Sequence, residues 1–167
     1  MKVLIVRDRK SAGGGIVNYY NTVTDYFAME VDYAPIGRPY AFYENKKISI
    51  FKRFTLTRLL LDYLCLIIKI VKFRPNIVII NGSIDEERKS VARDGLNVLI
   101  SKALGRKTIV FWRGFIGDSP QFPHKGGNKG VICRFYKMAD AYIVLARQFQ
   151  EDLERWGFTK PIFIETT

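Results

Sequence analysis

The sequence has few residues of the kinds that cross-link a small protein or bind a metal in it. Its 167 residues include two cysteines and one histidine. Cys65 and Cys133 both lie in apolar segments predicted to be helical, and no secretory signal precedes the first predicted strand. No zinc-type cysteine pair occurs. We therefore expect free, buried thiols in a cytosolic protein rather than a disulfide framework.

Several motifs of well-known enzyme classes are also missing. There is no internal repeat, low-complexity tract or heptad series. Gly13, Gly14 and Gly15 follow the first predicted strand, but the G-G-G spacing is not a dinucleotide fingerprint and lacks the Gly-Lys-Ser/Thr ending of a P-loop. No Gly-x-Ser-x-Gly elbow or His-Glu-x-x-His helix occurs. Hydrolase and metalloprotease functions therefore have no local support.

Basic residues outnumber acidic ones, and this imbalance favours an anionic partner. Lys and Arg total 27 and Asp and Glu total 16, which gives a formal net charge of +11. Such a charge suits a phosphate ligand, a nucleic acid or an acidic membrane surface. The basic residues are scattered, and the aromatic residues fall mostly on periodic core positions. We therefore do not expect a nucleic-acid partner.

One apolar segment, residues 56–73, is close to the length of a membrane-spanning helix. Four charged residues interrupt it: Arg58, Asp62, Lys69 and Lys72. At helical spacing they fall on one narrow stripe. Because charges near the centre of a bilayer are costly, we expect a core helix with one wet edge. An interfacial helix stays open as an alternative, since the basic and aromatic residues at 42–54 suit anionic headgroups.

Apolar runs alternate with helical patterns along the chain, which is typical of parallel strands joined by crossover helices. Strands are expected at 3–6, 29–33, 48–51, 76–80, 108–112, 141–145 and 161–165. Helices are expected near 16–27, 56–73, 91–103, 131–138 and 149–156. The predicted fold is α/β: one domain, residues 1–167, with a Rossmann-like, doubly wound, mostly parallel sheet flanked by helices on both faces.

The glycine run suggests an anion pocket after the first strand. Glycine lets backbone N–H groups approach a ligand closely, and the helix that follows points its positive dipole end at the same place. Arg7, Arg9 and Lys10 lie on the same connection and would strengthen the positive field. A flexible loop is the alternative interpretation.

Ligands of open α/β sheets bind at the carboxyl ends of the strands. The later predicted strands carry small polar residues and arginines at these ends. The residues are Asn81 and Ser83, then Arg113 and Gly114, and finally Arg147. They suit phosphate or sugar hydroxyls, with turn caps and a surface ion pair as the alternatives. The single histidine, His124, is either a general base, an anion contact or an exposed loop residue.

Four motifs in chain order resemble the amino-terminal domain of GT-B glycosyltransferases, of the large retaining family known as family 4 or group 1. They are MKVLIV followed by GGG, RPNIVIINGS, GRKTIVFWRG, and ADAYIVLARQFQEDLERWGFTKPIFIE. The resemblance covers nearly the whole chain. It implies an enzyme that transfers a sugar from a nucleotide-sugar to a saccharide or lipid-linked acceptor, in cell-surface polysaccharide synthesis.

The resemblance also implies roles for residues. Those expected to face the donor phosphates and the interdomain cleft are Gly13, Gly14, Gly15, Arg113 and Gly114. Those expected to bind the acceptor are Asn81, Ser83, His124 and Arg147. Arg113 stands where the family usually has histidine, and Ala146 with Arg147 replaces the usual Ser-Glu, so no catalytic residue is assigned.

In that family a second Rossmann-like domain binds the nucleotide with paired glutamates, which have no counterpart in this sequence. The 167 residues would then be the amino-terminal half of a two-domain enzyme, and this half alone is expected to be inactive. No metal or other cofactor is implied, because such enzymes stabilise the leaving diphosphate with basic side chains and a helix dipole. The positive charge would also suit an anionic inner membrane surface. The alternative from a different class is a stand-alone nucleotide or phosphosugar binding module without catalysis.

Overall fold

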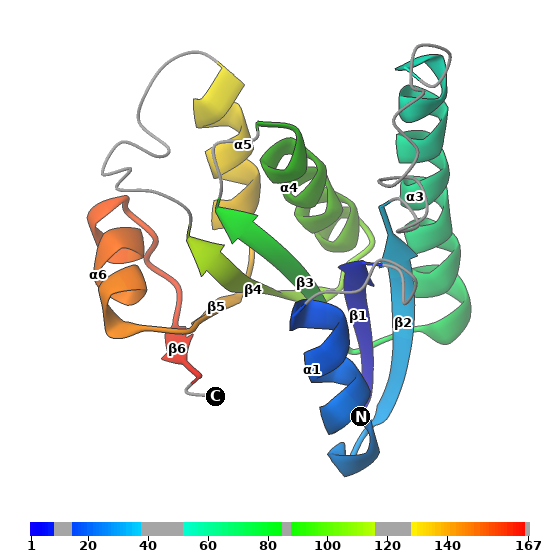
Figure 1. The fold of residues 1–167 in the computed structure, drawn as a ribbon, viewed down its shortest axis with the longest axis horizontal. Helices are drawn as coiled ribbons and strands as arrows, with labels where there is room; N and C mark the ends of the chain where they lie inside the picture. The colour runs from blue at the N-terminus through cyan, green and yellow to red at the C-terminus, as the bar shows by residue number, and fades with distance from the viewer. Residues whose placement is uncertain (9–14, 38–51, 85–87, 116–127, 166–167) are drawn as a thin grey trace. The chain divides into compact units, whose positions relative to one another are not determined.

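The computed structural model describes residues 1–8, 15–37, 52–84, 88–115 and 128–165, which are drawn in colour in Figure 1. The chain divides into two compact units, Met1–Asn76 and Ile77–Thr167. In each unit, parallel strands and helices alternate along the sequence. The boundary falls just after Pro75, in the short connection between a helix and a strand.

In the first unit, β1 (Lys2–Asp8) pairs in parallel with β2 (Glu30–Ile36). The two strands are joined by α1 (Gly15–Val23) and the short 3-10 helix η2 (Thr24–Tyr26). The apolar run at positions 3–6 is buried throughout, which is why it forms a strand without polar alternation. The Lys2 amide donates to Asn76 Oδ1 at 2.8 Å, and the Asn76 amide donates to the Lys2 carbonyl at 2.9 Å. These bonds tie the end of the unit to its first strand.

The long helix α3 (Lys52–Phe73) packs against β1 and β2. It ends before Arg74, whose φ is 52°, and before Pro75, which cannot continue a helix. Leu66 and Ile70 are buried on the strand side. None of the helices in the described ranges combines the length and the apolar character that crossing a membrane requires.

The sequence predicts that the charged stripe of α3 is its solvent-exposed face, and the structure differs from this prediction in part. Asp62, which belongs to that stripe, is buried. Two contacts stabilise its carboxylate there: it accepts a 3.0 Å hydrogen bond from the Gly37 amide and lies 3.6 Å from Arg58 Nε. The other three residues of the stripe do reach solvent, since Lys72 is exposed and Arg58 and Lys69 are half-buried. A second exposed side of the helix, which was not expected, is apolar; it consists of Leu60, Leu61, Leu64, Ile68 and Val71.

In the second unit, four parallel strands lie in the order β3 (Ile77–Ile84), β4 (Lys107–Phe115), β5 (Ala141–Val144) and β6 (Ile162–Ile164). The helices are α4 (Arg88–Ala103), α5 (Asn128–Lys137) and α6 (Arg147–Arg155). Gly105 follows α4 with φ of 71°, and Gly157 follows α6 with φ of 76°. Glycine adopts this left-handed conformation readily, so both helices end where the sequence places a glycine.

An aromatic cluster fills the core of the second unit. Trp112 of β4 stacks on Tyr142 of β5, with ring centroids 5.4 Å apart and planes 4° from parallel. Phe158 meets both rings edge-on. The Tyr142 hydroxyl donates to the Tyr136 carbonyl at 3.0 Å, and burial raises the pKa of this hydroxyl far above its ordinary value. Tyr142 therefore stays protonated and links β5 to α5.

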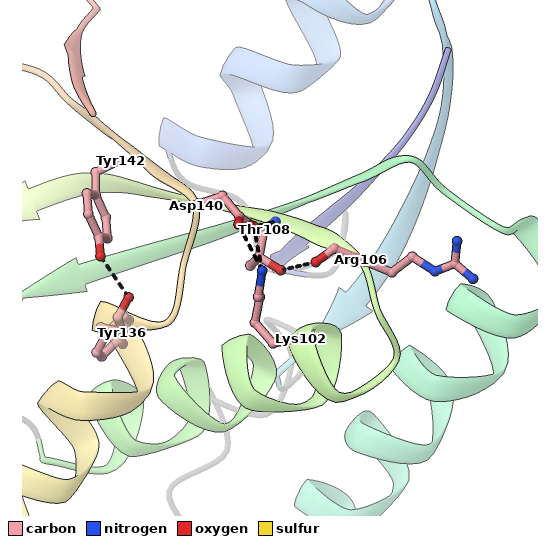
Figure 2. A network of polar contacts seen from close by, with 6 residues as sticks. All are labelled: Lys102, Arg106, Thr108, Tyr136, Asp140 and Tyr142. Atoms are coloured by element: carbon pink, nitrogen blue, oxygen red, sulfur yellow. Dashed lines mark hydrogen bonds and ion pairs between the residues drawn. The ribbon is translucent and has the colours of Figure 1, made fainter. Parts of the chain in front are cut away.

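A polar network ties the amino ends of β4 and β5 together, as Figure 2 shows. Lys102 Nζ, in the last turn of α4, lies 2.9 Å from both carboxylate oxygens of Asp140. The Thr108 amide donates to Asp140 Oδ2 at 2.7 Å, and the Asp140 amide donates to the Thr108 carbonyl at 2.8 Å. We name these three residues the amino-end network.

The titration of Asp140 reflects this network. Burial by itself would raise the pKa of the carboxyl group. The hydrogen bonds from Lys102 and the Thr108 amide, together with the charges of Lys102 and Lys160, outweigh burial and hold the pKa below its ordinary value. The ionised form of Asp140 is thus the form that the fold stabilises.

The structure confirms the predicted fold class, an α/β protein in which parallel strands alternate with helices. Cys65 lies in α3 and Cys133 in α5 as free cysteines; Cys133 is buried and Cys65 is half-buried. β3 and β4 extend beyond their predicted ends, because Ser83 and Gly114 pair in register. The predicted strand at 48–51 lies outside the described residues. The organisation as one domain stays a prediction.

Candidate functional site

Asn81 of β3 and Arg113 of β4, both predicted site residues, meet at the carboxyl ends of their strands. Arg113 Nε donates a 3.3 Å hydrogen bond to Asn81 Oδ1. The guanidinium carbon lies 4.0 Å from the centre of the Phe111 ring, which supports the flat group by a cation–π contact. Asn81 is 4% exposed and Arg113 is half-buried. Residues 32 positions apart in sequence thus form one polar unit, which we name the carboxyl-end pair.

A break in strand register accounts for the position of Arg113. Gly82 pairs with Trp112, whereas the next residue, Ser83, pairs with Gly114, so β4 has one extra residue at this point. That residue is Arg113. A β-bulge of this kind bends the strand and redirects the side chain of the extra residue, and bulges are over-represented next to active sites. The β-bulge therefore lies at Arg113, the charged residue of the pair.

A buried carboxylate on α4, which the sequence interpretation missed, lies against the same part of β3. Asp94 is 1% exposed and accepts a 2.8 Å hydrogen bond from Arg93 Nε. Its Oδ2 would be only 3.2 Å from a Cβ atom at Gly82. Glycine at this position therefore lets the carboxylate approach the strand. Spacing from the buried Val91 at i, i+3 is the signal that could have indicated a buried Asp94.

Asn97, one turn further along α4, is a second buried polar group that the sequence interpretation missed. It is 1% exposed, and neither its side-chain nitrogen nor its side-chain oxygen has a hydrogen-bond partner among the described residues. The Ser101 hydroxyl donates a 2.8 Å hydrogen bond to the backbone carbonyl of Asn97 and not to its side-chain amide. A buried amide of this kind costs free energy of folding.

The other predicted site residues are spread over both units. Gly15 begins α1 in the first unit, and a Cβ there would meet nothing within 4 Å. Ser83 and Gly114 pair in register next to the carboxyl-end pair. Arg147 is the first residue of α6 and is strongly exposed, and its Nε lies 3.7 Å from Glu151 Oε1. The predicted site residues Gly13, Gly14 and His124 lie outside the described residues.

Arg7, which was expected to add positive charge near the glycines, is bound inside the first unit instead. It is 3% exposed, and its guanidinium carbon lies 4.0 Å from the centre of the Tyr33 ring. Its Nη1 donates to the Val17 carbonyl and to Asn21 Oδ1, each at 3.4 Å. Arg7 thus braces α1 against β2. Arg9 and Lys10 lie outside the described residues.

The carboxyl-end pair has the chemistry of a binding site. A guanidinium group held in a fixed plane suits the oxygens of a phosphate, and an amide side chain suits sugar hydroxyls. In the part of the chain that the structure describes, no three His, Cys, Asp or Glu side chains gather as metal ligands do. Burial raises the pKa of the Cys133 thiol, with partial compensation from the Lys137 charge, so this cysteine is protonated and unreactive.

No protein-family model matches the sequence of this chain, and no curated protein matches it. What the fold and the site define is an α/β protein of Rossmann-like type with an arginine and asparagine pair at the carboxyl ends of two parallel strands.

Proposed function

We propose that this chain is the amino-terminal, acceptor-side part of a GT-B glycosyltransferase. The reaction would move a sugar from a nucleotide-sugar to a saccharide or lipid-linked acceptor, in the synthesis of cell-surface polysaccharide. The observation that carries the proposal is the hydrogen-bonded pair of Asn81 and Arg113, with Arg113 on a β-bulge. Ligands of open parallel α/β sheets bind at such strand ends. The resemblance of four motifs in chain order points to the same family.

In this proposal, Arg113 neutralises the diphosphate of the donor and of the leaving group. Asn81 orients the guanidinium plane by accepting the Nε hydrogen bond, and Phe111 supports its face. A charge that is already oriented stabilises negative charge developing in the transition state without further reorganisation. Gly114, which lacks a side chain, gives phosphate oxygens close access to the backbone.

The remaining roles follow the family resemblance. The proposed acceptor contacts are Asn81, Ser83, His124 and Arg147, and the proposed donor-side contacts include Gly13, Gly14 and Gly15. Nucleotide binding falls to a second Rossmann-like domain. The basic side chains and a helix dipole, rather than a metal ion or other cofactor, stabilise the leaving diphosphate.

Substitution of Arg113 tests this proposal. The full-length protein is incubated with UDP-sugars and GDP-sugars and with lipid-linked and saccharide acceptors, and the release of nucleoside diphosphate is measured. We expect Arg113→Ala to lower this release by about tenfold or more, because a charge-assisted hydrogen bond to phosphate is lost. Arg155→Ala removes the same charge from an exposed surface ion pair and should leave the rate unchanged.

The same experiment separates the alternative function. Pyrophosphate binding to the chain, measured by calorimetry, should weaken in Arg113→Ala and not in Arg155→Ala. If pyrophosphate binding depends on Arg113 but no donor releases its nucleoside diphosphate, the stand-alone binding module replaces the transferase. Equal binding and equal turnover in the two variants would remove Arg113 from the site.

A further inference from the structure

The apolar, solvent-facing side of α3 has no role in the proposed function. Its five large side chains are between 43% and 60% exposed: Leu60, Leu61, Leu64, Ile68 and Val71. At about 100° per residue they fall within an arc of about 100°, opposite the buried Leu66 and Ile70. We name these five residues the α3 stripe. The solvent side of a helix in a soluble domain is normally polar, so a contiguous apolar stripe marks an interaction surface.

A groove next to the α3 stripe adds a polar edge to this surface. It is an open groove with a volume of about 470 Å³, and its lining includes Leu61, Leu64 and Ile68 of the stripe. Lys69, Lys72 and Asp32 also line it. Lys69 Nζ lies 2.6 Å from Asp32 Oδ2, which fixes the ammonium group at the groove. Asp32 neutralises Lys69, so the exposed Lys72 supplies the positive charge at the groove. Apolar side chains beside its ammonium group match the chemistry of an amphiphile with an anionic head.

The charge of α3 narrows the choice of partner. The helix contains five basic residues and one acidic residue, and Lys72 in its last turn is exposed. The whole chain has a net charge of +11. Two copies packed through this face would bring like charges together, whereas an anionic surface would neutralise them. Charge complementarity therefore favours an anionic partner over a second copy of the chain.

We infer that α3 docks on an anionic lipid bilayer. The helix lies in the plane of the membrane interface, with the α3 stripe inserted among the acyl chains and Lys72 at the level of the headgroups. Apolar insertion and attraction of basic side chains to anionic lipid act together in such interfacial helices. The inference does not depend on the transferase proposal, because lipid docking requires neither a sugar donor nor Arg113.

Vesicle sedimentation tests this inference. The full chain is mixed with vesicles of phosphatidylcholine alone or of phosphatidylcholine with phosphatidylglycerol. We expect at least about tenfold stronger binding to the anionic vesicles, weakened by added salt. Leu64→Glu with Ile68→Glu should abolish that binding. Tyr26→Glu with Met138→Glu, which makes the same change of charge at exposed apolar residues elsewhere, should retain most of it.

A milder variant keeps the test decisive if the double substitution disturbs folding. Leu64→Trp places an indole in the α3 stripe, and brominated lipids should quench its fluorescence in anionic vesicles. Tyr26→Trp, outside the stripe, should not be quenched above the background of the native tryptophans. Unchanged vesicle binding by the glutamate variant, equal binding to neutral vesicles, or a dimer that the same variant dissociates would each overturn the inference.

Discussion

The two ends of the parallel strands in the second unit carry polar groups of different kinds. At the amino ends, Lys102, Thr108 and Asp140 satisfy one another, and the Asp140 side chain is 42% exposed. At the carboxyl ends, Asn81 is 4% exposed and Asp94 is 1% exposed, beside a break in strand register. Burying polar groups costs free energy unless each is well matched. The contacts at the amino end therefore stabilise the fold, whereas the carboxyl end places buried polar side chains beside an irregular strand, which is the arrangement on which the proposed ligand site rests.

Substitution of Trp112 should have the largest effect on stability at the carboxyl end. Trp112 directly precedes Arg113 in β4. It is 1% exposed and packs against Tyr142 and Phe158. We expect Trp112→Ala to lower the free energy of unfolding by about 3–5 kcal/mol, measured by urea denaturation. Tyr26→Ala, at an exposed ring, should change it by less than about 0.5 kcal/mol. A loss below about 1 kcal/mol for Trp112→Ala would mean that aromatic packing does not hold the carboxyl end.

Asn97 allows the cost of a buried polar group to be measured. Replacing its unmatched amide with an apolar side chain of similar size, in Asn97→Leu, should raise the free energy of unfolding by about 1–2 kcal/mol. The control variant Asn81→Leu should lower the free energy of unfolding, because Asn81 accepts a hydrogen bond from Arg113 that leucine cannot accept. Thermal unfolding of both variants measures the difference. Destabilisation by Asn97→Leu as large as that by Asn81→Leu would contradict the distinction between the two amides.

Asp140 gives the smallest effect and tests the amino-end network. Because its pKa in the folded protein lies below the ordinary value of 3.8, its contribution to stability is complete above that value and is lost as the pH falls through the lower one. Asp140→Asn removes the charge and keeps an oxygen for the Thr108 amide. It should cost about 1 kcal/mol or less at neutral pH, since the pair with Lys102 is partly exposed.

The acid limb of the stability curve checks the same residue. As the pH falls below about 4, Asp140→Asn should lose less stability than the parent protein, measured by urea unfolding at each pH. Identical acid dependence in the two proteins would show that Asp140 contributes nothing through its charge.

Apolar runs predicted the strands that the structure has at 77–84, 107–115 and 141–144, because an uninterrupted run such as positions 77–80, which follows Pro75, favours a strand buried on both faces. They were insufficient at the strand ends. Asn81 and Arg113 were expected to follow their strands, but parallel pairing continues through the bulge to Ser83 and Gly114. Pairing between strands is a non-local property, and local composition does not contain it.

The side chains around the site illustrate a second limit of sequence interpretation. Asn81 and Arg113 were predicted separately from their positions near strand ends, and the structure adds the hydrogen bond between them. Asp94 and Asn97 were missed because hydrophobic periodicity identifies buried faces by apolar residues. On α3 the reverse holds, since apolar residues at helical spacing turned out to face solvent. Periodicity identifies a helix, but packing decides which face is covered.

Amide chemical shifts measured by NMR during a pyrophosphate titration test the central claim most directly, because they report on both strand ends in one experiment. We expect the amides of Gly82, Arg113 and Gly114 to shift with a common saturation curve, while those of Thr108 and Asp140 stay unchanged. Shifts centred on Thr108 and Asp140, or spread evenly over the surface lysines with none at Arg113, would contradict the assignment of binding to the carboxyl ends.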